Sequence, residues 1–243
     1  MPRLLIAFLL FALVAGCGQT LPIGEQRAYT LTHGDQTSGY LLYLPEAYEE
    51  TPDTTRWPLM LFLHGAGERG TNINQVTVNG PPKQLQAGQQ MPFIVVSPQS
   101  PPNQFWGDQI EWLDALLREV TDTYRVDLDR VYVTGLSMGG FGTWSLATAY
   151  PDRFAALAPI CGGGDANTVC ALRHIPTWVF HGDADEVVPP ERSQVMVDSL
   201  QACNGNVQFT LYPGVGHDSW TPTYNDPRLY EWLLAQRRPD GTP

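Results

Sequence analysis

The chain has 243 residues, of which 43% are hydrophobic and 16% are charged, and its formal net charge at pH 7 is −11. An acidic surface repels nucleic acid and other polyanions, so those partners are excluded. The length and apolar content suit one globular domain with a sizeable core. The sequence has no internal repeat or low-complexity tract of the kind that favours a solenoid or a disordered module.

Residues 1–16 have the pattern of an export signal. Arg3 precedes an apolar run at residues 4–14, which is too short to cross a bilayer comfortably. The segment ending at Cys17 resembles a bacterial lipoprotein box, in which the cysteine is acylated; an ordinary secretory signal, with Cys17 incidental, is the alternative. Gly18 after the cysteine, in place of an acidic residue, indicates the outer membrane. We therefore expect an exported lipoprotein on the periplasmic side of the cell envelope, attached to the membrane through Cys17.

The remaining chain divides into a short linker at residues 17–25 and a single domain at residues 26–238. The domain begins with two predicted strands at residues 26–32 and 39–44, which a short turn joins into an antiparallel hairpin. The nearly continuous apolar run at residues 57–63 is typical of a strand that is buried on both faces.

From that strand onward, apolar runs that predict strands alternate with segments of helical apolar spacing. Further strands are expected at residues 93–97, 131–134, 154–160, 176–180 and 207–212, with a turn at 127–130. Helices are expected at residues 82–87, 111–124, 138–150, 191–202 and 227–236. This alternation predicts an α/β fold with a mostly parallel sheet, helices on both faces, an antiparallel N-terminal hairpin and no large lid.

A Gly-X-Ser-X-Gly turn, Gly135 to Gly139, joins the strand at 131–134 to the next helix. Glycines beside a serine let the neighbouring backbone pass close by and allow a strained serine conformation. The hydroxyl then projects above the sheet at a helix N-terminus, where free N–H groups and the positive end of the helix dipole lie. The pattern predicts a nucleophile elbow at Ser137; the alternative is that the glycines only cap a turn.

A serine hydroxyl needs a base, and the base needs an acid to orient it. In an open α/β sheet these partners come from loops at the carboxyl ends of later strands. For the chain order Ser, acid, His, the base is predicted to be His217, which is the only histidine after Asp185. Asp185 is the preferred acid because its loop is long enough to curl back; Asp183 is the alternative, with loop hydrogen bonding as its structural role.

The oxyanion hole requires two backbone N–H groups aimed at the developing negative charge. Met138, directly after the serine, is expected to supply one, and Ala66, in the glycine-rich loop after the first buried strand, the other. His64 and His181 each precede a glycine at a strand end, where a side chain–backbone hydrogen bond would hold the loop.

These motifs together resemble the α/β-hydrolase superfamily, and within it the secreted esterase branch that includes polyhydroxybutyrate depolymerases, feruloyl esterases and "predicted peptidases" close to the prolyl oligopeptidase catalytic domain. The resemblance rests on the segments 64–70, 135–140, 181–189 and 216–217, and it covers residues 26–237. It implies Ser137 as the nucleophile, His217 as the base and Asp185 as the orienting acid of an acyl-enzyme mechanism.

Cysteine usage follows from export. With Cys17 acylated, three cysteines remain, and an oxidising compartment permits one disulfide. Cys170 and Cys203 each lie near the end of a predicted helix and form the expected pair, with Cys161 buried and free after an apolar strand. There is no Cys-x-x-Cys pair and no His-Glu-x-x-His motif, so neither a metal site nor a cofactor is expected.

The expected partner is an ester, either a small molecule or an oligomer. Trp106 and Trp220 fall beside the predicted site and suit aryl or sugar-bearing substrates, with ordinary packing as the alternative for both. An open cleft without a lid favours short-chain, aryl or carbohydrate-linked esters over long lipid chains. Two other function classes stay open: a peptidase or amidase of the prolyl oligopeptidase-like type that uses the same triad, and a non-catalytic lipoprotein that shares the fold.

Overall fold

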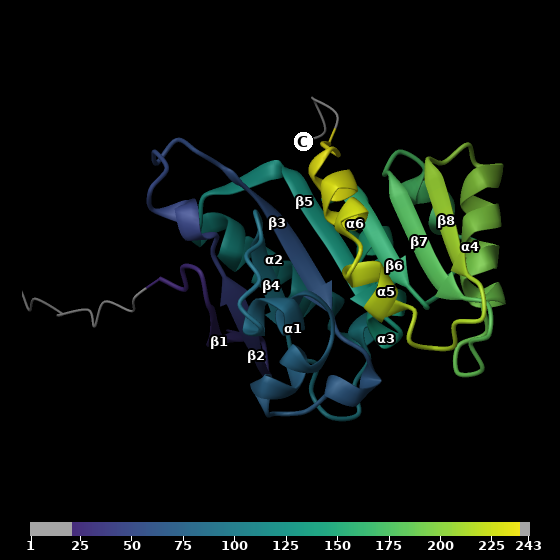
Figure 1. The fold of residues 1–243 in the computed structure, drawn as a ribbon, viewed down its shortest axis with the longest axis horizontal. Coiled ribbons are helices and arrows are strands. Elements are labelled where there is room, and N and C mark those ends of the chain that lie inside the picture. Colours follow the sequence, from purple (N-terminus) through teal and green to yellow (C-terminus); the bar gives the residue numbers. More distant parts are fainter. Residues whose placement is uncertain (1–20, 239–243) are drawn as a thin grey trace, which may run out of the picture.

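The computed structural model describes residues 21–238, and the strands in this range form one sheet in the order β1-β2-β4-β3-β5-β6-β7-β8 (Figure 1). They are β1 (Gln26–His33), β2 (Gln36–Tyr43), β3 (Trp57–Leu63), β4 (Ile94–Pro98), β5 (Val126–Leu136), β6 (Ala156–Ile160), β7 (Thr177–Gly182) and β8 (Val207–Tyr212). β1 and β2 form the predicted antiparallel hairpin, β2 also runs antiparallel to β4, and the other neighbours are parallel. The predicted α/β class is confirmed.

Helices cover both faces of this sheet (Figure 1). They are α1 (Gly80–Gln86), α2 (Ile110–Thr123), α3 (Met138–Ala149), α4 (Glu191–Ala202), α5 (Trp220–Tyr224) and α6 (Pro227–Leu234). Apolar side chains of α2, α3 and α4 belong to the core on one face, and those of α1, α5 and α6 belong to the core on the other. The two layers follow from the crossover connections that parallel strands require.

β3 shows why its sequence is almost continuously apolar. Leu59, Leu61 and Leu63 point into the core that contains α2 and α3, whereas Met60 and Phe62 point into the core that contains α1 and α6. All five side chains are fully buried. A strand with helices on both faces has no polar face, so the alternation that marks a half-buried strand is absent here.

β5 begins earlier than the sequence predicts. Residues 127–130, expected as a turn, belong to this strand, which pairs with β3 at Trp57 and again at Leu59 with a shift of register between the two. The extra residues bulge, and Arg130 Nε lies 2.7 Å from Asp127 Oδ2 on this half-exposed stretch. Charged residues therefore interrupt the apolar pattern while the backbone continues in the sheet.

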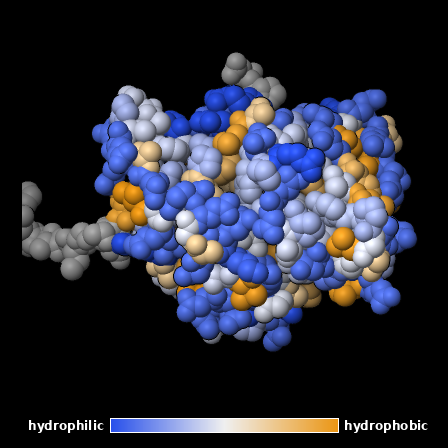
Figure 2. Space-filling view, in the orientation of Figure 1, coloured by the Kyte–Doolittle hydropathy of each residue, from blue (hydrophilic) through white to orange (hydrophobic). Residues whose placement is uncertain are grey.

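Part of the predicted linker is attached to the domain. The N–H of Leu44 donates to the carbonyl of Pro22, and the N–H of Gly24 donates to the carbonyl of Leu44. The predicted signal segment 1–16 and Cys17 lie outside the described residues. Between residues 21 and 238, no helix combines the length and apolar composition that a membrane span needs. On the face shown in Figure 2, hydrophobic residues form small separate spots on a mostly hydrophilic surface.

A disulfide joins the turn before β7 to the end of α4. It links Cys170, in the 3₁₀ helix η5 (Val169–Leu172), to Cys203, with 5.6 Å between their Cα atoms. Cys161 is buried and free. The bond closes a loop of the chain that contains β7 and α4 and that also carries Asp185.

Candidate active site

Ser137 occupies a sharp turn between β5 and α3. Its backbone has φ 52° and ψ −116°, a strained conformation for a residue other than glycine, and its N–H donates to the carbonyl of Ile160 at 2.9 Å. The flanking glycines permit this turn: a Cβ at Gly135 would lie 2.4 Å from the carbonyl oxygen of Gly139, and a Cβ at Gly139 would lie 1.8 Å from that of Leu63. The close packing of α3 on β3 and β5 therefore excludes larger residues at both positions.

Three side chains from distant loops meet at this turn. His217 Nε2 lies 2.9 Å from Ser137 Oγ, and His217 Nδ1 lies 2.7 Å from Asp185 Oδ2. Because a carboxylate only accepts hydrogen bonds, the proton of the neutral imidazole is on Nδ1, which leaves Nε2 to accept the Ser137 hydroxyl proton. The serine, the histidine and the aspartate thus form one continuous hydrogen-bonded chain.

The Asp185 carboxylate is buried and is held by four N–H groups. Oδ1 accepts from the backbone N–H of Val187 and of Val188, both at 2.9 Å, while Oδ2 lies close to His217 and 3.2 Å from Nε2 of His181. Burial alone would raise the pKa of Asp185, but the hydrogen bonds from His217 and the two backbone groups outweigh it and hold the pKa below its ordinary value. The carboxylate is therefore charged where it orients His217.

The other residues of this loop have structural roles. His181 Nε2 lies 2.8 Å from the carbonyl of Val188, which confirms the expected side chain–backbone bond. Asp183, the alternative acid, instead accepts a hydrogen bond from the N–H of Gly214 at 2.6 Å on the exposed side of the loop. Its carboxylate therefore joins the two loops and is not the partner of His217.

Two backbone N–H groups start helical segments, one directly after Ser137 and one in the loop after β3. Met138 is the first residue of α3, and Ala66 is the first residue of the 3₁₀ helix η2 (Ala66–Glu68). The first N–H groups of a helix have no carbonyl partner within it, so both are available to bind an anion. These are the two residues that the sequence indicates for an oxyanion hole.

His64 fixes the loop that carries Ala66. Its Nε2 accepts a hydrogen bond from the N–H of Ser100 at 2.9 Å, so Nδ1 carries the proton and donates to the carbonyl of Gly65 at 2.6 Å. The ring is fully buried, and this burial lowers the pKa of His64 to about 4. A neutral histidine thus bonds two loops together, as the sequence indicates for this position.

Trp106 does not occupy the position expected of a substrate contact. Its side chain, in the 3₁₀ helix η4 (Trp106–Gln109), is fully buried. The indole N–H donates to the carbonyl of His64 at 2.9 Å, and the ring packs edge-on against the His64 imidazole at 4.9 Å between centroids. The prediction is wrong because this segment folds beneath the loop that carries Ala66, where the tryptophan supports the loop from the core side.

Trp220 is half-buried at the start of α5, and its ring lies perpendicular to the His217 imidazole at 5.2 Å between centroids. The indole N–H donates to Asn79 Oδ1 at 3.2 Å, and Asn79 Nδ2 donates to the buried carboxylate of Glu68 at 2.5 Å. This connection between the Ala66 loop and the His217 loop was not expected from the sequence. Glu68 lies in the glycine-rich segment 64–70, but nothing in the sequence spacing links Glu68 to Asn79.

Cys161 lies directly behind the serine. Its Sγ accepts a hydrogen bond from the N–H of Ser137 at 3.3 Å, and burial raises the pKa of the thiol to about 12. Within residues 21–238, Cys161, Asp185 and His217 are the group whose potential ligand atoms lie within 4.8 Å of one another. Both Asp185 oxygens already accept hydrogen bonds, so this carboxylate serves to orient His217.

The dienelactone hydrolase family matches residues 102–226, which include all three side chains of the hydrogen-bonded chain. The chain belongs to the dienelactone hydrolase family. Among its relatives, feruloyl esterase C of Emericella nidulans is 30% identical over 212 residues, which cover 83% of this chain and 74% of that protein.

Solved structures agree with this family. A thermostable esterase superimposes with a TM-score of 0.79 and 35% identity over 89% of this chain; the chain spans 64% of that esterase's length. A mutant feruloyl esterase module from Clostridium thermocellum, complexed with sinapinate, has a TM-score of 0.65 and 18% identity over 86% of this chain and 87% of the module, and shows the same fold. Family, relatives and structures together support a carboxylic ester hydrolase with the α/β-hydrolase fold.

Proposed function

We propose that this member of the dienelactone hydrolase family is a serine esterase that works through an acyl-enzyme. The observation that carries the proposal is the chain of hydrogen bonds from Ser137 Oγ through His217 to Asp185, with distances of 2.9 and 2.7 Å. Asp185 holds the imidazole in the tautomer that accepts a proton at Nε2, so the serine hydroxyl becomes a nucleophile when it transfers that proton.

The reaction has two steps. Ser137 Oγ attacks the ester carbonyl as His217 Nε2 takes its proton, and the N–H groups of Ala66 and Met138 stabilise the oxyanion. The oxyanion collapses, the bond to the alcohol oxygen breaks, and His217 returns the proton to that oxygen. Water, deprotonated by His217, then attacks the acyl-enzyme and releases the acid and free Ser137.

The proposed substrates are short-chain, aryl or carbohydrate-linked esters. The half-buried Trp220 beside His217 provides an aromatic surface for a flat acyl or alcohol group. The feruloyl esterase names of the relatives support the same class. A pocket of about 210 Å³ next to this tryptophan, between α1 and α5, offers room for a small group.

Active-site labelling tests the proposal. A fluorophosphonate probe is expected to label the wild-type protein and not Ser137→Ala, and hydrolysis of p-nitrophenyl acetate is expected to disappear in the same variant. An unlabelled, inactive wild type would support a non-catalytic lipoprotein. Equal turnover of an aminoacyl p-nitroanilide would support the peptidase alternative, for which no contact in the site argues.

We further propose that the protein is exported and attached to the periplasmic side of the outer membrane through an acylated Cys17. The disulfide between Cys170 and Cys203 supports an oxidising compartment. Fractionation tests the anchor: wild-type protein is expected in the membrane fraction and Cys17→Ser in the soluble fraction, and identical distribution of the two would refute it.

A further inference from the structure

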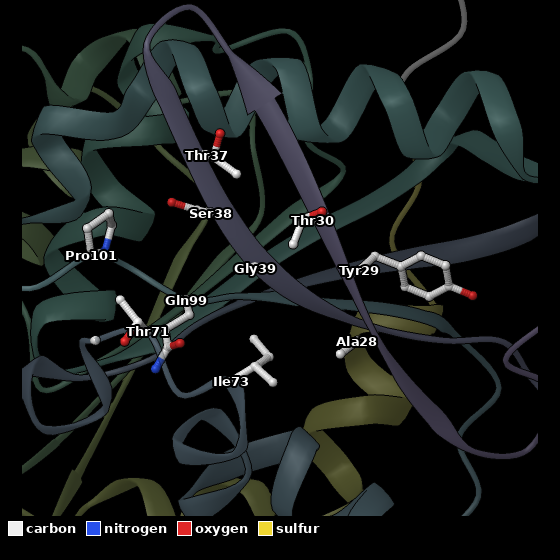
Figure 3. A pocket seen from close by; sticks show the side chains of 11 residues that line it. Ala28, Tyr29, Thr30, Thr37, Ser38, Gly39, Thr71, Ile73, Gln99 and Pro101 are labelled. Atoms are coloured by element: carbon white, nitrogen blue, oxygen red, sulfur yellow. The ribbon is translucent and has the colours of Figure 1, made fainter.

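A second pocket lies away from Ser137, between the β1–β2 hairpin and the chain that follows η2. Its volume is about 590 Å³, within the range of small-molecule sites. Thr30 and Gly39 come from the hairpin, Thr71 and Ile73 from the segment after η2, and Gln99 from the end of β4; Figure 3 shows these residues around the pocket.

A glycine on β2 creates the hollow. Gly39 pairs with Thr30 across the hairpin, and a Cβ at Gly39 would lie 3.5 Å from Cδ1 of Ile73 and 3.7 Å from the carbonyl oxygen of Tyr29. The hairpin therefore presents bare backbone at this point. Thr30 and the loop residue Ile73 form walls beside it.

Gln99 places an unused hydrogen-bond acceptor at this pocket. Its side chain is 3% exposed, and its Nε2 donates to the carbonyl of Glu68 at 2.9 Å and to that of Asn72 at 2.8 Å. Both protons of the amide are used, which fixes which end is oxygen. Within residues 21–238 no donor bonds to Oε1, which is therefore free to accept a hydrogen bond from a hydroxyl group in the pocket.

The lining selects a neutral ligand rich in hydroxyl groups. No acidic or basic side chain lines the pocket, so a charged ligand would have no counter-charge. The hydroxyls of Thr30 and Thr71 can both donate and accept, as a sugar hydroxyl does, while the Thr37 hydroxyl bonds to that of Thr32. Ile73 and Pro101 offer apolar surface.

The pocket and the candidate active site share one loop. Gly70 at the pocket is four positions after Ala66 in the chain, so the Cα atoms of these two residues lie at most about 14 Å apart. Gln99 also bonds to the backbone of Glu68, in the 3₁₀ helix that Ala66 opens. An ester with a saccharide chain can therefore reach both places at once.

We propose that this pocket binds a neutral sugar unit of a carbohydrate-linked ester whose ester group lies at Ser137. The proposal rests on the esterase function proposed above. It adds the alcohol side of the substrate: Gln99 Oε1 accepts a hydrogen bond from a sugar hydroxyl, and the threonine hydroxyls bind its neighbours.

Two matched variants test it in the full chain with Ser137→Ala. Thr30→Phe fills the pocket, whereas Thr123→Phe places the same ring at an exposed position of α2 outside the lining. Binding is measured by titration calorimetry with a panel of neutral tetrasaccharides of xylose, arabinose, glucose, galactose or mannose. At least one is expected to bind, about tenfold or more weakly in Thr30→Phe and within about twofold of the parent in Thr123→Phe.

Three results would overturn the proposal: no tetrasaccharide binds, the two phenylalanine variants behave alike, or a neutral tetra-alanine peptide binds in a manner that depends on Thr30. With Ser137 intact, hydrolysis of p-nitrophenyl acetate is expected to be the same in Thr123→Phe and wild type. If the wild type does not hydrolyse p-nitrophenyl acetate, the esterase function is refuted, and the sugar-binding result stands on its own.

Discussion

Acidification is expected to weaken the fold through His64, because the buried imidazole is neutral in the folded protein. Its pKa is about 4 in the structure and 6.5 in an unfolded chain. Between these values the unfolded state binds the proton and the folded state does not, so stability falls as pH falls. The contribution is complete above pH 6.5 and lost below about pH 4.

The size of the effect follows from the two pKa values. A shift of this size corresponds to about 3 kcal/mol in full, of which about 2 kcal/mol is lost between pH 8 and pH 5. Asp185 does not contribute in this window, because its depressed pKa matters only as pH falls below the ordinary value of 3.8.

Urea unfolding at pH 8 and pH 5 measures this difference in wild type and in His64→Gln, whose side-chain oxygen can replace Nε2 as acceptor for the N–H of Ser100. The wild type is expected to lose about 2 kcal/mol more than the variant over this range. NMR titration of the His64 ring should give a midpoint near 4. A midpoint near 6.5, together with equal losses in both proteins, would refute the reasoning.

The remaining predictions concern the site and its support. Asp185→Asn is expected to keep the fold by circular dichroism and to lower kcat for p-nitrophenyl acetate about 10³–10⁴-fold, since an amide no longer fixes the His217 tautomer; a change below tenfold would argue against this role. Replacing Cys170 and Cys203 by serine should lower the free energy of unfolding by about 3–4 kcal/mol for a separation of 33 residues, and urea curves unaltered by the change would contradict the bond. Gly139→Ala should destabilise by about 3 kcal/mol or more in the same assay, while Gly67→Ala, with open space around its Cβ, should be neutral. Equal stability of these two glycine variants would show that α3 does not pack as closely as described.

Local sequence patterns were sufficient to predict the bounds of those strands and helices that are determined by their own residues. β3, α4 and β8 occupy the residues expected from the sequence; β3 is recognisable because a strand buried on both faces reads as one continuous apolar run. α5 was missed, since five residues are too short to display a helical period. The start of β5 was not predicted because the bulge contains charged residues. The backbone pairing with β3 continues across the bulge, but backbone pairing cannot be recognised from the sequence.

The sequence by itself determined the fold class, and it named Ser137, Asp185 and His217, because strand-end loops and chain order restrict which residues can meet. Only the tertiary structure decided the surroundings of these residues. It put Trp106 beneath the Ala66 loop, joined Trp220 to Glu68 through Asn79, and opened a pocket at Gly39. Each of these depends on contacts between segments far apart in the chain, and such contacts are set by packing and not by any local period.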